Sequence, residues 1–388
     1  MEDAKDVFIP VYNRYPIVLE KGEDVYLYDE LGKKYLDFAA GIAVFALGYS
    51  NPSYKEALKS QVDTLIHTSN LFYNKPSVEA AKKLVKASGM EKVFFTNSGT
   101  EAIEGVIKLA RKYHYNKTGQ ANGEIIAMHH SFHGRSMGAL AVTGQPKYQV
   151  AFGPMLSHIK FAEFNDLESV KEQITDKTCG ILLETIQGEG GIYPAKKEFM
   201  QGIRNLCDEL DILMLCDEIQ CGMGRTGYMF AYQGYDIIPD AMTTAKALGC
   251  GIPVGAFLAR GKAAKVLVPG DHGSTYGCNP LAGAAVNAVF DQFDQLDLLS
   301  HVKEVGDYLE EKLNQLVQEY DYVIERRGVG CMQGIECKGP VNDIIRKAQE
   351  KGLLVISAGP SILRFVPPLV IEKSHVDEMI ATIKECLS

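Results

Sequence analysis

Short apolar runs alternate with longer stretches of helical periodicity between about residue 90 and residue 260. The runs are bounded by glycine and polar residues, which is typical of strands that are buried on both faces of a parallel sheet. The alternation predicts an α/β domain with a doubly wound, mostly parallel sheet. The expected strands are 93–96, 124–128, 180–184, 212–216 and 254–259, and the expected helices are 101–113 and 198–209.

The two ends of the chain follow a different pattern. Residues 23–38 predict a β-hairpin, because apolar positions flank the polar turn 29–32. Long amphipathic stretches begin after about residue 285, and strand candidates follow at 323–334 and 353–356. We expect the two ends to pack together as one smaller α+β domain.

The length of the chain supports a division into two domains. Its 388 residues, of which 46% are hydrophobic, exceed what a single hydrophobic core usually holds. We expect a large domain over residues 49–283, and a small domain made of residues 1–48 and 284–388.

Charge and hydropathy exclude several classes of protein. The formal net charge is -9, from 49 acidic and 40 basic residues, which argues against a nucleic-acid-binding surface or an anionic-membrane surface. No apolar stretch approaches the roughly 20 residues of a membrane helix. The start Met1-Glu2-Asp3 lacks the basic and apolar segments of a signal peptide. We therefore expect a cytoplasmic protein, with its nine cysteines reduced and no metal site.

Ser98, Gly99 and Thr100 lie between the first expected strand and the helix after it. The first N–H groups of a helix are free to bind an anion, glycine allows close approach and threonine adds a hydroxyl. The segment therefore indicates a phosphate site. A capped helix start without a ligand is the alternative.

Asp217 and Lys246 each follow a predicted strand or an apolar run. A buried carboxylate at the carboxyl end of a parallel strand needs a cationic partner, such as a protonated pyridine nitrogen. Burial of a lysine lowers its pKa and frees the amine for Schiff-base chemistry. The alternatives are an exposed capping aspartate and a lysine whose ammonium reaches solvent.

The segment 131–135 adds an aromatic ring and an arginine just beyond a strand. Phe132 can stack on a planar heterocycle, and Arg135 can bind a carboxylate through two parallel hydrogen bonds. We interpret His133 as a structural polar residue. A phosphate site, a stacking ring, a carboxylate and a reactive lysine are together what pyridoxal phosphate requires.

These motifs make the chain resemble the class III aminotransferases of fold type I, and within that class the acetylornithine aminotransferases. The likeness covers nearly the whole chain. It implies an enzyme that transfers the terminal amino group of N2-acetylornithine to 2-oxoglutarate, giving N-acetylglutamate 5-semialdehyde and glutamate, as in arginine biosynthesis. The matching stretches are DFAAGIAV (37–44), NSGTEA (97–102), SFHGR (131–135), QGEGG (187–191), LCDEIQCGMGRTG (215–227), TTAKALG (243–249), HGSTYGCNPLA (272–282) and LRFVPPL (363–369).

The resemblance implies roles in cofactor binding. Lys246 matches the lysine that forms the Schiff base, Asp217 the partner of the pyridinium, and Phe132 the residue stacked on the ring. Gln220 matches a group near the ring hydroxyl. Thr275 matches a threonine that reaches the phosphate from the partner subunit, which implies a homodimer with shared sites. The remaining phosphate-binding matches are Ser98, Gly99 and Thr100.

The resemblance also implies roles in substrate binding. Arg135 matches the arginine that binds the carboxylate of the acylated amino acid, and Ser274 matches a substrate contact. Arg364 matches the arginine for the α-carboxylate of glutamate or 2-oxoglutarate. Glu189 matches the glutamate that pairs with that arginine in the other half-reaction.

Several positions depart from the resemblance. Ile103 and Phe45 stand where the class usually has asparagine, and Tyr49 stands where it usually has histidine. Ile42 stands where ornithine δ-aminotransferases carry a tyrosine, which disfavours free ornithine as the substrate. The alternatives are a transaminase for succinylornithine, 4-aminobutyrate or ornithine, a mutase, racemase or decarboxylase on the same fold, and a cofactor-binding protein without catalysis.

Overall fold

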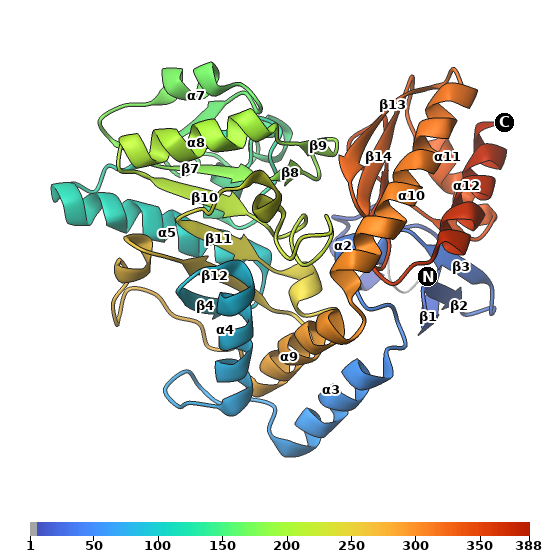
Figure 1. Ribbon diagram of the computed structural model, residues 1–388, viewed down its shortest axis with the longest axis horizontal. Helices are drawn as coiled ribbons and strands as arrows, with labels where there is room; N and C mark the ends of the chain where they lie inside the picture. Colours follow the sequence, from blue (N-terminus) through green and yellow to red (C-terminus); the bar gives the residue numbers. More distant parts are fainter. Residues whose placement is uncertain (1–5) are drawn as a thin grey trace.

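A seven-stranded mixed sheet is the central layer of the computed structural model, which describes residues 6–388 (Figure 1). The strand order is β4-β12-β11-β10-β7-β5-β6. Only β12 runs antiparallel to its neighbours within this sheet, so the doubly wound, mostly parallel sheet is confirmed. The strands are β4 (Lys92–Thr96), β5 (Glu124–Met128), β6 (Ile159–Ala162), β7 (Thr178–Glu184), β10 (Leu213–Asp217), β11 (Ala241–Thr244) and β12 (Gly255–Ala259).

Side chains on β10 alternate between two separate cores, because successive residues of a strand point to opposite faces. Leu213 and Leu215 pack in a cluster with residues of α5 (Gly99–Thr118). Met214 and Cys216 pack in a cluster with residues of α8 (Lys197–Glu209). The strand is therefore apolar at every position except Asp217, its last residue.

Both ends of the chain contribute to a single small sheet beside the large one (Figure 1). In this sheet β3 (Lys34–Asp37), close to the N-terminus, pairs in parallel with β15 (Leu353–Leu354), close to the C-terminus. The packing of the two ends into a smaller α+β part is thereby confirmed, while the domain boundaries stay a prediction. The other strands of this part are β1 (Leu19–Glu23), β2 (Tyr26–Asp29), β13 (Val323–Val329), β14 (Met332–Cys337), β16 (Ile356–Ser357) and β17 (Ile362–Phe365).

Two strand candidates in the C-terminal part differ from the structure. The segment 323–334 is not a single strand: it turns at Gly330, whose φ is 59°, and forms the hairpin of β13 and β14. The segment 353–356 is divided at Val355 between β15 and β16, which belong to different sheets. Apolar runs of this kind predict extended backbone but do not show where the chain leaves one sheet for another.

Three of the long helices have an asparagine cap and a proline at the first or second helical position. The side chains of Asn51, Asn74 and Asn279 each accept a backbone N–H of the first turn. None of the helices within residues 6–388 combines the length and apolar character that crossing a membrane requires. The remaining elements are α2 (Ala40–Ala43), α3 (Pro52–Thr64), α4 (Lys75–Ser88), α6 (Met137–Ala141), η1 (Pro146–Tyr148), α7 (Leu167–Gln173), β8 (Ile186–Gln187), β9 (Tyr193–Pro194), η2 (Ala231–Tyr235), η3 (Lys246–Leu248), η4 (Ala263–Lys265), α9 (Pro280–Gln295), α10 (Leu298–Glu319), α11 (Asn342–Glu350) and α12 (Lys373–Leu387).

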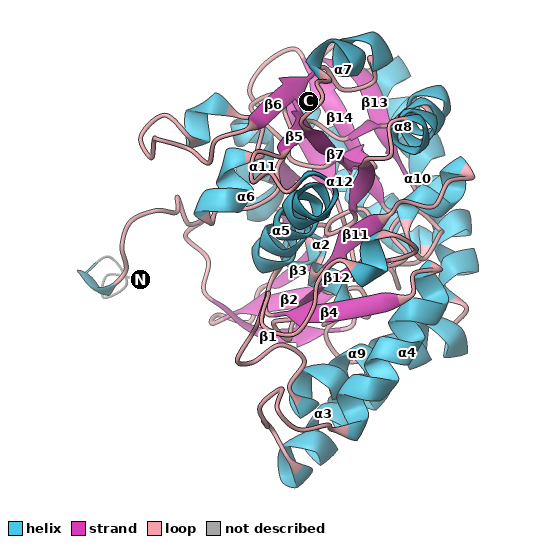
Figure 2. Ribbon diagram, turned by 90° about the vertical axis from the view of Figure 1, so that its left-hand side faces the viewer, coloured by secondary structure: helices cyan, strands magenta, loops and turns pink. Residues whose placement is uncertain are grey.

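The segment before β1 extends away from the rest of the molecule (Figure 2). Its apolar side chains are exposed, Ile9 at 78% and Val7 at 75%. A second exposed apolar stretch follows α3 and includes Leu71, Phe72 and Tyr73. Exposed apolar area of this extent is typical of a surface that another chain covers.

Candidate active site

A cavity of about 470 Å³ opens at the carboxyl ends of the central strands. The four clusters that the sequence singled out all meet in its wall, as expected for the ligand site of an open α/β sheet. Its lining includes Ser98, Gly99, Thr100, Phe132, Arg135, Asp217, Gln220 and Lys246.

One end of the cavity is formed by the start of α5. Ser98 is the N-cap, and its hydroxyl accepts the N–H of Glu101 at 3.3 Å. The other N–H groups of this first turn have no acceptor within the helix and can bind an anion. A Cβ on Gly99 would lie 2.8 Å from Ile219 Cδ1, so packing against Ile219 also demands glycine here. Thr100 Oγ1 lies 2.8 Å from Ser136 Oγ and joins the helix start to the loop that carries Arg135.

The carboxylate of Asp217 lies at the end of β10 and is almost fully buried. Its Oδ1 accepts the N–H of Ile219 at 2.9 Å and the hydroxyl of Thr243 at 3.2 Å. Its Oδ2 lies 2.7 Å from His133 Nδ1. Burial lowers the pKa of His133, but the hydrogen bond to Asp217 and its charge outweigh burial, and the pKa is raised overall. His133 is thus a polar residue of the site, and the sequence alone does not predict its contact with Asp217.

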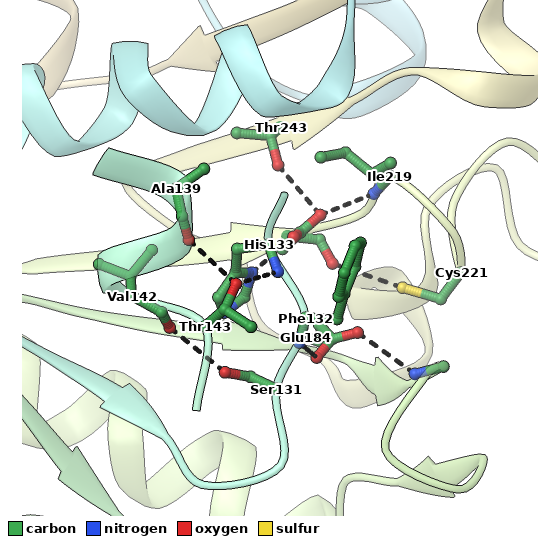
Figure 3. A network of polar contacts seen from close by, with 12 residues as sticks. Ser131, Phe132, His133, Ala139, Val142, Thr143, Glu184, Ile219, Cys221 and Thr243 are labelled. Atoms are coloured by element: carbon green, nitrogen blue, oxygen red, sulfur yellow. Dashed lines mark hydrogen bonds and ion pairs between the residues drawn. The ribbon is translucent and has the colours of Figure 1, made fainter. Parts of the chain in front are cut away.

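Glu184, the last residue of the strand expected at 180–184, is a second acidic residue at this sheet edge. It lies directly beside Asp217 in the register of β7 and β10. Its carboxylate accepts the N–H of Phe132 at 3.0 Å and the N–H of Gly188 at 3.2 Å (Figure 3). Burial raises the pKa of Glu184 to about 7. The signal was present: like Asp217, Glu184 is an acidic residue that directly follows an apolar run.

Lys246 follows β11 in an unusual backbone conformation. Its φ is 49°, in the left-handed region, and it begins the short 3-10 turn η3. Such conformations occur preferentially at functional sites. The side chain is partly exposed to the cavity, yet burial lowers the pKa of Lys246 to about 8, against the opposing charge of Glu189. A substantial fraction of its amine is therefore neutral near pH 8 and able to attack a carbonyl.

Arg364, which is buried, and Glu189, which is partly exposed, form an ion pair beside Gln220 of the cavity wall. Arg364 Nη1 lies 2.6 Å from Glu189 Oε1 and also donates to Gln220 Oε1 at 3.1 Å. Burial raises the pKa of Glu189, but the charge and hydrogen bond of Arg364 outweigh it, so the pKa is lowered overall. Arg364 Nε has no hydrogen-bond partner within the described part of the chain.

Arg135, Ser274 and Thr275 occupy outer positions. The exposed guanidinium of Arg135 lies at the cavity, over the ring of Tyr148. Ser274 and Thr275 line a different depression, beside Asn97 and Glu101. The structure of this one chain therefore does not bring the last two residues into the main cavity.

Phe45 and Tyr49, which depart from the resemblance, form a contact that supports the cavity wall. Their rings lie 4.7 Å apart, and the hydroxyl of Tyr49 donates to the buried carboxylate of Asp37. Asp37 also accepts the N–H of Ala39 at 2.8 Å and of Ala40 at 3.0 Å. These bonds hold the start of α2, the turn directly before Val44 in the cavity wall.

Four successive residues of α2 have left-handed backbone, with φ between 46° and 66° for Ala40, Gly41, Ile42 and Ala43. Left-handed backbone costs about 1–2 kcal/mol for each non-glycine residue, so the surrounding bonds must hold the turn. Ile42 is 45% exposed on this turn. Ile103, the third departure, is fully buried in the core beneath α5, where an apolar side chain suits its surroundings.

Comparison with known proteins identifies the family. The model of the family described as aminotransferase class III matches residues 9–387. The chain belongs to the class III aminotransferases. It is 47% identical to an acetylornithine aminotransferase of Methanocaldococcus jannaschii, over 98% of this chain and 96% of the relative. It is 45% identical to an acetylornithine aminotransferase of Clostridium acetobutylicum, over 99% of this chain and 100% of the relative.

Solved structures of aminotransferases share the fold. The N-acetylornithine aminotransferase of Stenotrophomonas maltophilia is 36% identical, with a TM-score of 0.85 over 97% of this chain and 96% of that one. The ornithine aminotransferase of Toxoplasma gondii is 27% identical, with a TM-score of 0.95 over 100% of this chain and 93% of that one. The fold type I architecture is thereby confirmed.

Aminotransferases of this class depend on pyridoxal phosphate, and the donor set of the cavity fits that cofactor. Lys246 offers a partly neutral amine for the aldehyde, and the start of α5 offers free N–H groups for the phosphate. Asp217 offers a buried carboxylate for a protonated ring nitrogen, and Phe132 offers an aromatic face for the ring. The enzyme is thus a pyridoxal-phosphate-dependent transaminase.

Proposed function

We propose that this aminotransferase moves the terminal amino group of N2-acetylornithine to 2-oxoglutarate, giving N-acetylglutamate 5-semialdehyde and glutamate. The expected setting is arginine biosynthesis. The observation that carries the proposal is the ion pair between Arg364 and Glu189, 2.6 Å apart. Arg364 can bind a carboxylate of glutamate or 2-oxoglutarate when Glu189 moves aside, and it stays paired with Glu189 when acetylornithine is bound. The relatives named as acetylornithine aminotransferases support this choice of donor.

The two substrates carry different charges into one cavity. Glutamate has two carboxylates, which Arg135 and Arg364 bind, whereas acetylornithine has one, which lies far from the reacting amine. Removing one partner of a buried ion pair costs about 3–5 kcal/mol, so Arg364 needs Glu189 when acetylornithine is bound. Glu189 moves aside when the dicarboxylate arrives. Ser274 lies outside the main cavity of its own chain and, like Thr275, would add its contact to the substrate in the cavity of the partner subunit.

Residues of this chain would hold the cofactor and move the proton. Ser98, Gly99 and Thr100 hold the phosphate, Phe132 and Gln220 contact the ring, and Asp217 stabilises the positive charge on the ring nitrogen. The bound cofactor supplies an electron-withdrawing ring that stabilises the electron pair left when a C–H bond of the substrate breaks. Lys246 Nζ would accept that proton from the carbon that carries the reacting amine and deliver it to the cofactor carbon that receives the amino group. The pKa of about 8 suits this exchange.

A homodimer with shared sites is part of the proposal. Thr275 is exposed and lies outside the main cavity of its own chain, as a residue that serves the partner subunit would. The exposed apolar segment before β1 and the stretch that includes Leu71, Phe72 and Tyr73 offer surface for the contact. Sedimentation of the purified protein, and cell fractionation for the expected cytoplasmic location, test these points.

The donor is tested by steady-state rates with 2-oxoglutarate as the acceptor. N-acetylornithine should give the highest kcat/KM among N-acetylornithine, succinylornithine, ornithine and 4-aminobutyrate. Succinyldiaminopimelate belongs in the series, because a relative of Photorhabdus laumondii, 42% identical over 98% of this chain and 96% of its own, is named for both donors. A higher kcat/KM for any other donor would replace acetylornithine. Turnover without a 2-oxo acid would indicate a mutase, racemase or decarboxylase.

A further inference from the structure

The guanidinium of Arg135 rests on an aromatic ring instead of an acidic side chain. Its Cζ lies 3.8 Å from the ring centroid of Tyr148 and 5.4 Å from that of Phe132. No carboxylate of residues 6–388 lies within ion-pair distance of it. A cation over an aromatic face is attracted by the ring without using its N–H groups. The donors of Arg135 therefore stay free for a ligand.

Arg364 is held in the opposite way. It is 3% exposed, and one of its nitrogens, Nη1, forms an ion pair with the carboxylate of Glu189. A substrate carboxylate must displace Glu189 before it binds Arg364, whereas nothing competes for Arg135. Arg364 can therefore bind a substrate carboxylate in one half-reaction only, whereas Arg135 can bind one in both.

The turn that carries Tyr148 is fixed to the wall of the cavity. The N–H of Tyr148 donates to the carbonyl of Gln145 at 3.0 Å, and the amide of Gln145 donates to the carbonyl of Ser131 at 3.0 Å. The amide of Gln149 donates to the carbonyl of Thr143 at 2.8 Å. These bonds fix the backbone on both sides of the ring, so the ring is pre-organised.

Tyr148 also contacts the ring expected to stack on the cofactor. The edge of one ring faces the other: the centroids of Phe132 and Tyr148 are 6.3 Å apart and the rings are inclined by 84°. This edge-to-face arrangement is a favourable one for aromatic pairs. The position of Arg135 is thereby tied, through Tyr148, to the position of Phe132 in the cavity wall.

We propose that Tyr148 is a positioning residue, whose ring sets the guanidinium of Arg135 at a fixed place relative to the cofactor ring and leaves its donors free for the substrate carboxylate in both half-reactions. The proposal rests on the role of Arg135 in the proposed function. The ring face carries the effect, so the hydroxyl of Tyr148 is dispensable. Lys147 shares the ring, with its Nζ 4.8 Å from the centroid, and does not replace Arg135.

The test compares Tyr148→Leu and Tyr148→Phe in the holoenzyme. Tyr148→Leu should raise the KM for both N-acetylornithine and 2-oxoglutarate about twofold to fivefold, the range expected for loss of a cation–π contact at an exposed site, with little change in kcat. Tyr148→Phe should keep both KM values close to wild type. The matched control is Tyr308→Leu. Tyr308 lies on helix α10, away from the cavity, and its ring centroid is 5.0 Å from Lys312 Nζ. This variant should leave both KM values unchanged.

Three outcomes would overturn the proposal. Unchanged KM values in Tyr148→Leu, with strongly raised values in Arg135→Ala, would remove the positioning role and keep the role of Arg135. Unchanged values in Arg135→Ala as well would refute that role in the proposed function. Equal damage in Tyr148→Phe and Tyr148→Leu, or loss of bound cofactor in both, would mean that the hydroxyl or a general structural role matters, not the ring face.

Discussion

Glu189 Oε1 lies 2.6 Å from Arg364 Nη1, and the same nitrogen donates to Gln220 Oε1 at 3.1 Å. The buried guanidinium is therefore neutralised by a side chain that is itself partly exposed, with 26% of its side-chain surface accessible. A fixed cation with a more accessible counter-ion suits a site that must accept a carboxylate in only one half-reaction.

The variant Glu189→Gln should slow the acetylornithine half-reaction more than the glutamate half-reaction. The amide cannot neutralise Arg364 when the monocarboxylate is bound, and an unpaired buried charge is costly. We expect a difference of about tenfold or more, measured by single-turnover spectra of each half-reaction. The control is Glu304→Gln, because the carboxylate of Glu304 forms a surface ion pair with Lys373 at 2.6 Å. Equal slowing of both half-reactions would refute the exchange of partners at Arg364.

The variant Lys246→Ala should lose turnover while it still binds the cofactor. Lys246 Nζ moves the proton in the proposed reaction, and a positioned acid or base contributes about 10²–10⁴-fold to the rate. The phosphate and ring contacts remain, so cofactor content after dialysis should stay measurable. Lys262→Ala removes a lysine that pairs with Asp211 at 2.8 Å away from the cavity, and should keep its activity. An active Lys246→Ala enzyme would contradict the assignment of the lysine.

In the cofactor-free protein, labelling of Lys246 by a small amine reagent should show a midpoint near pH 8. Burial disfavours the ammonium form, so the pKa is lowered from 10.5 to about 8, and the reactive amine appears as pH rises through that value. Glu189 raises this pKa through its negative charge, so Glu189→Gln should move the midpoint to lower pH. Peptide mass spectrometry after labelling over pH 6–11 measures both. A midpoint near 10.5 would show an exposed, ordinary lysine.

Glu184 should make the folded protein less stable as pH rises towards neutrality. Its pKa is raised by burial from 4.5 to about 7, so the folded state binds a proton that the unfolded state releases. This contribution is complete below pH 4.5 and is lost as pH rises through about 7. Glu184→Gln should therefore flatten the fall in the free energy of unfolding between pH 5 and 7.5, measured by denaturant titration. The control is Glu168→Gln, which changes an exposed glutamate. Parallel curves for wild type and Glu184→Gln would contradict the shift.

The sequence predicted the central sheet and most of the cavity wall because both have local signatures. The buried strands β5, β7 and β10 are continuous apolar runs, so the polar residues that end them are conspicuous. Asp217 was located in this way. Lys246 was located by the small and apolar residues around it.

Other features depend on contacts between distant segments and were not visible in the sequence. His133 reaches Asp217 across 84 positions of the chain, and Tyr148 meets Arg135 only because the turn after α6 folds back. The left-handed turn at Ile42 has a single glycine, so its composition does not predict four such residues in a row. The division of residues 353–356 between two sheets follows from tertiary pairing, which periodicity does not encode.

The most direct test of the account is an absorbance spectrum of the purified protein before and after addition of N-acetylornithine, without 2-oxoglutarate. The account predicts a visible band from cofactor bound to Lys246, which disappears in favour of a near-ultraviolet band as the amino group is transferred. A visible band that ignores acetylornithine and responds to ornithine, succinylornithine or 4-aminobutyrate would contradict the proposed donor. The absence of a visible band after addition of pyridoxal phosphate would contradict the cofactor site itself.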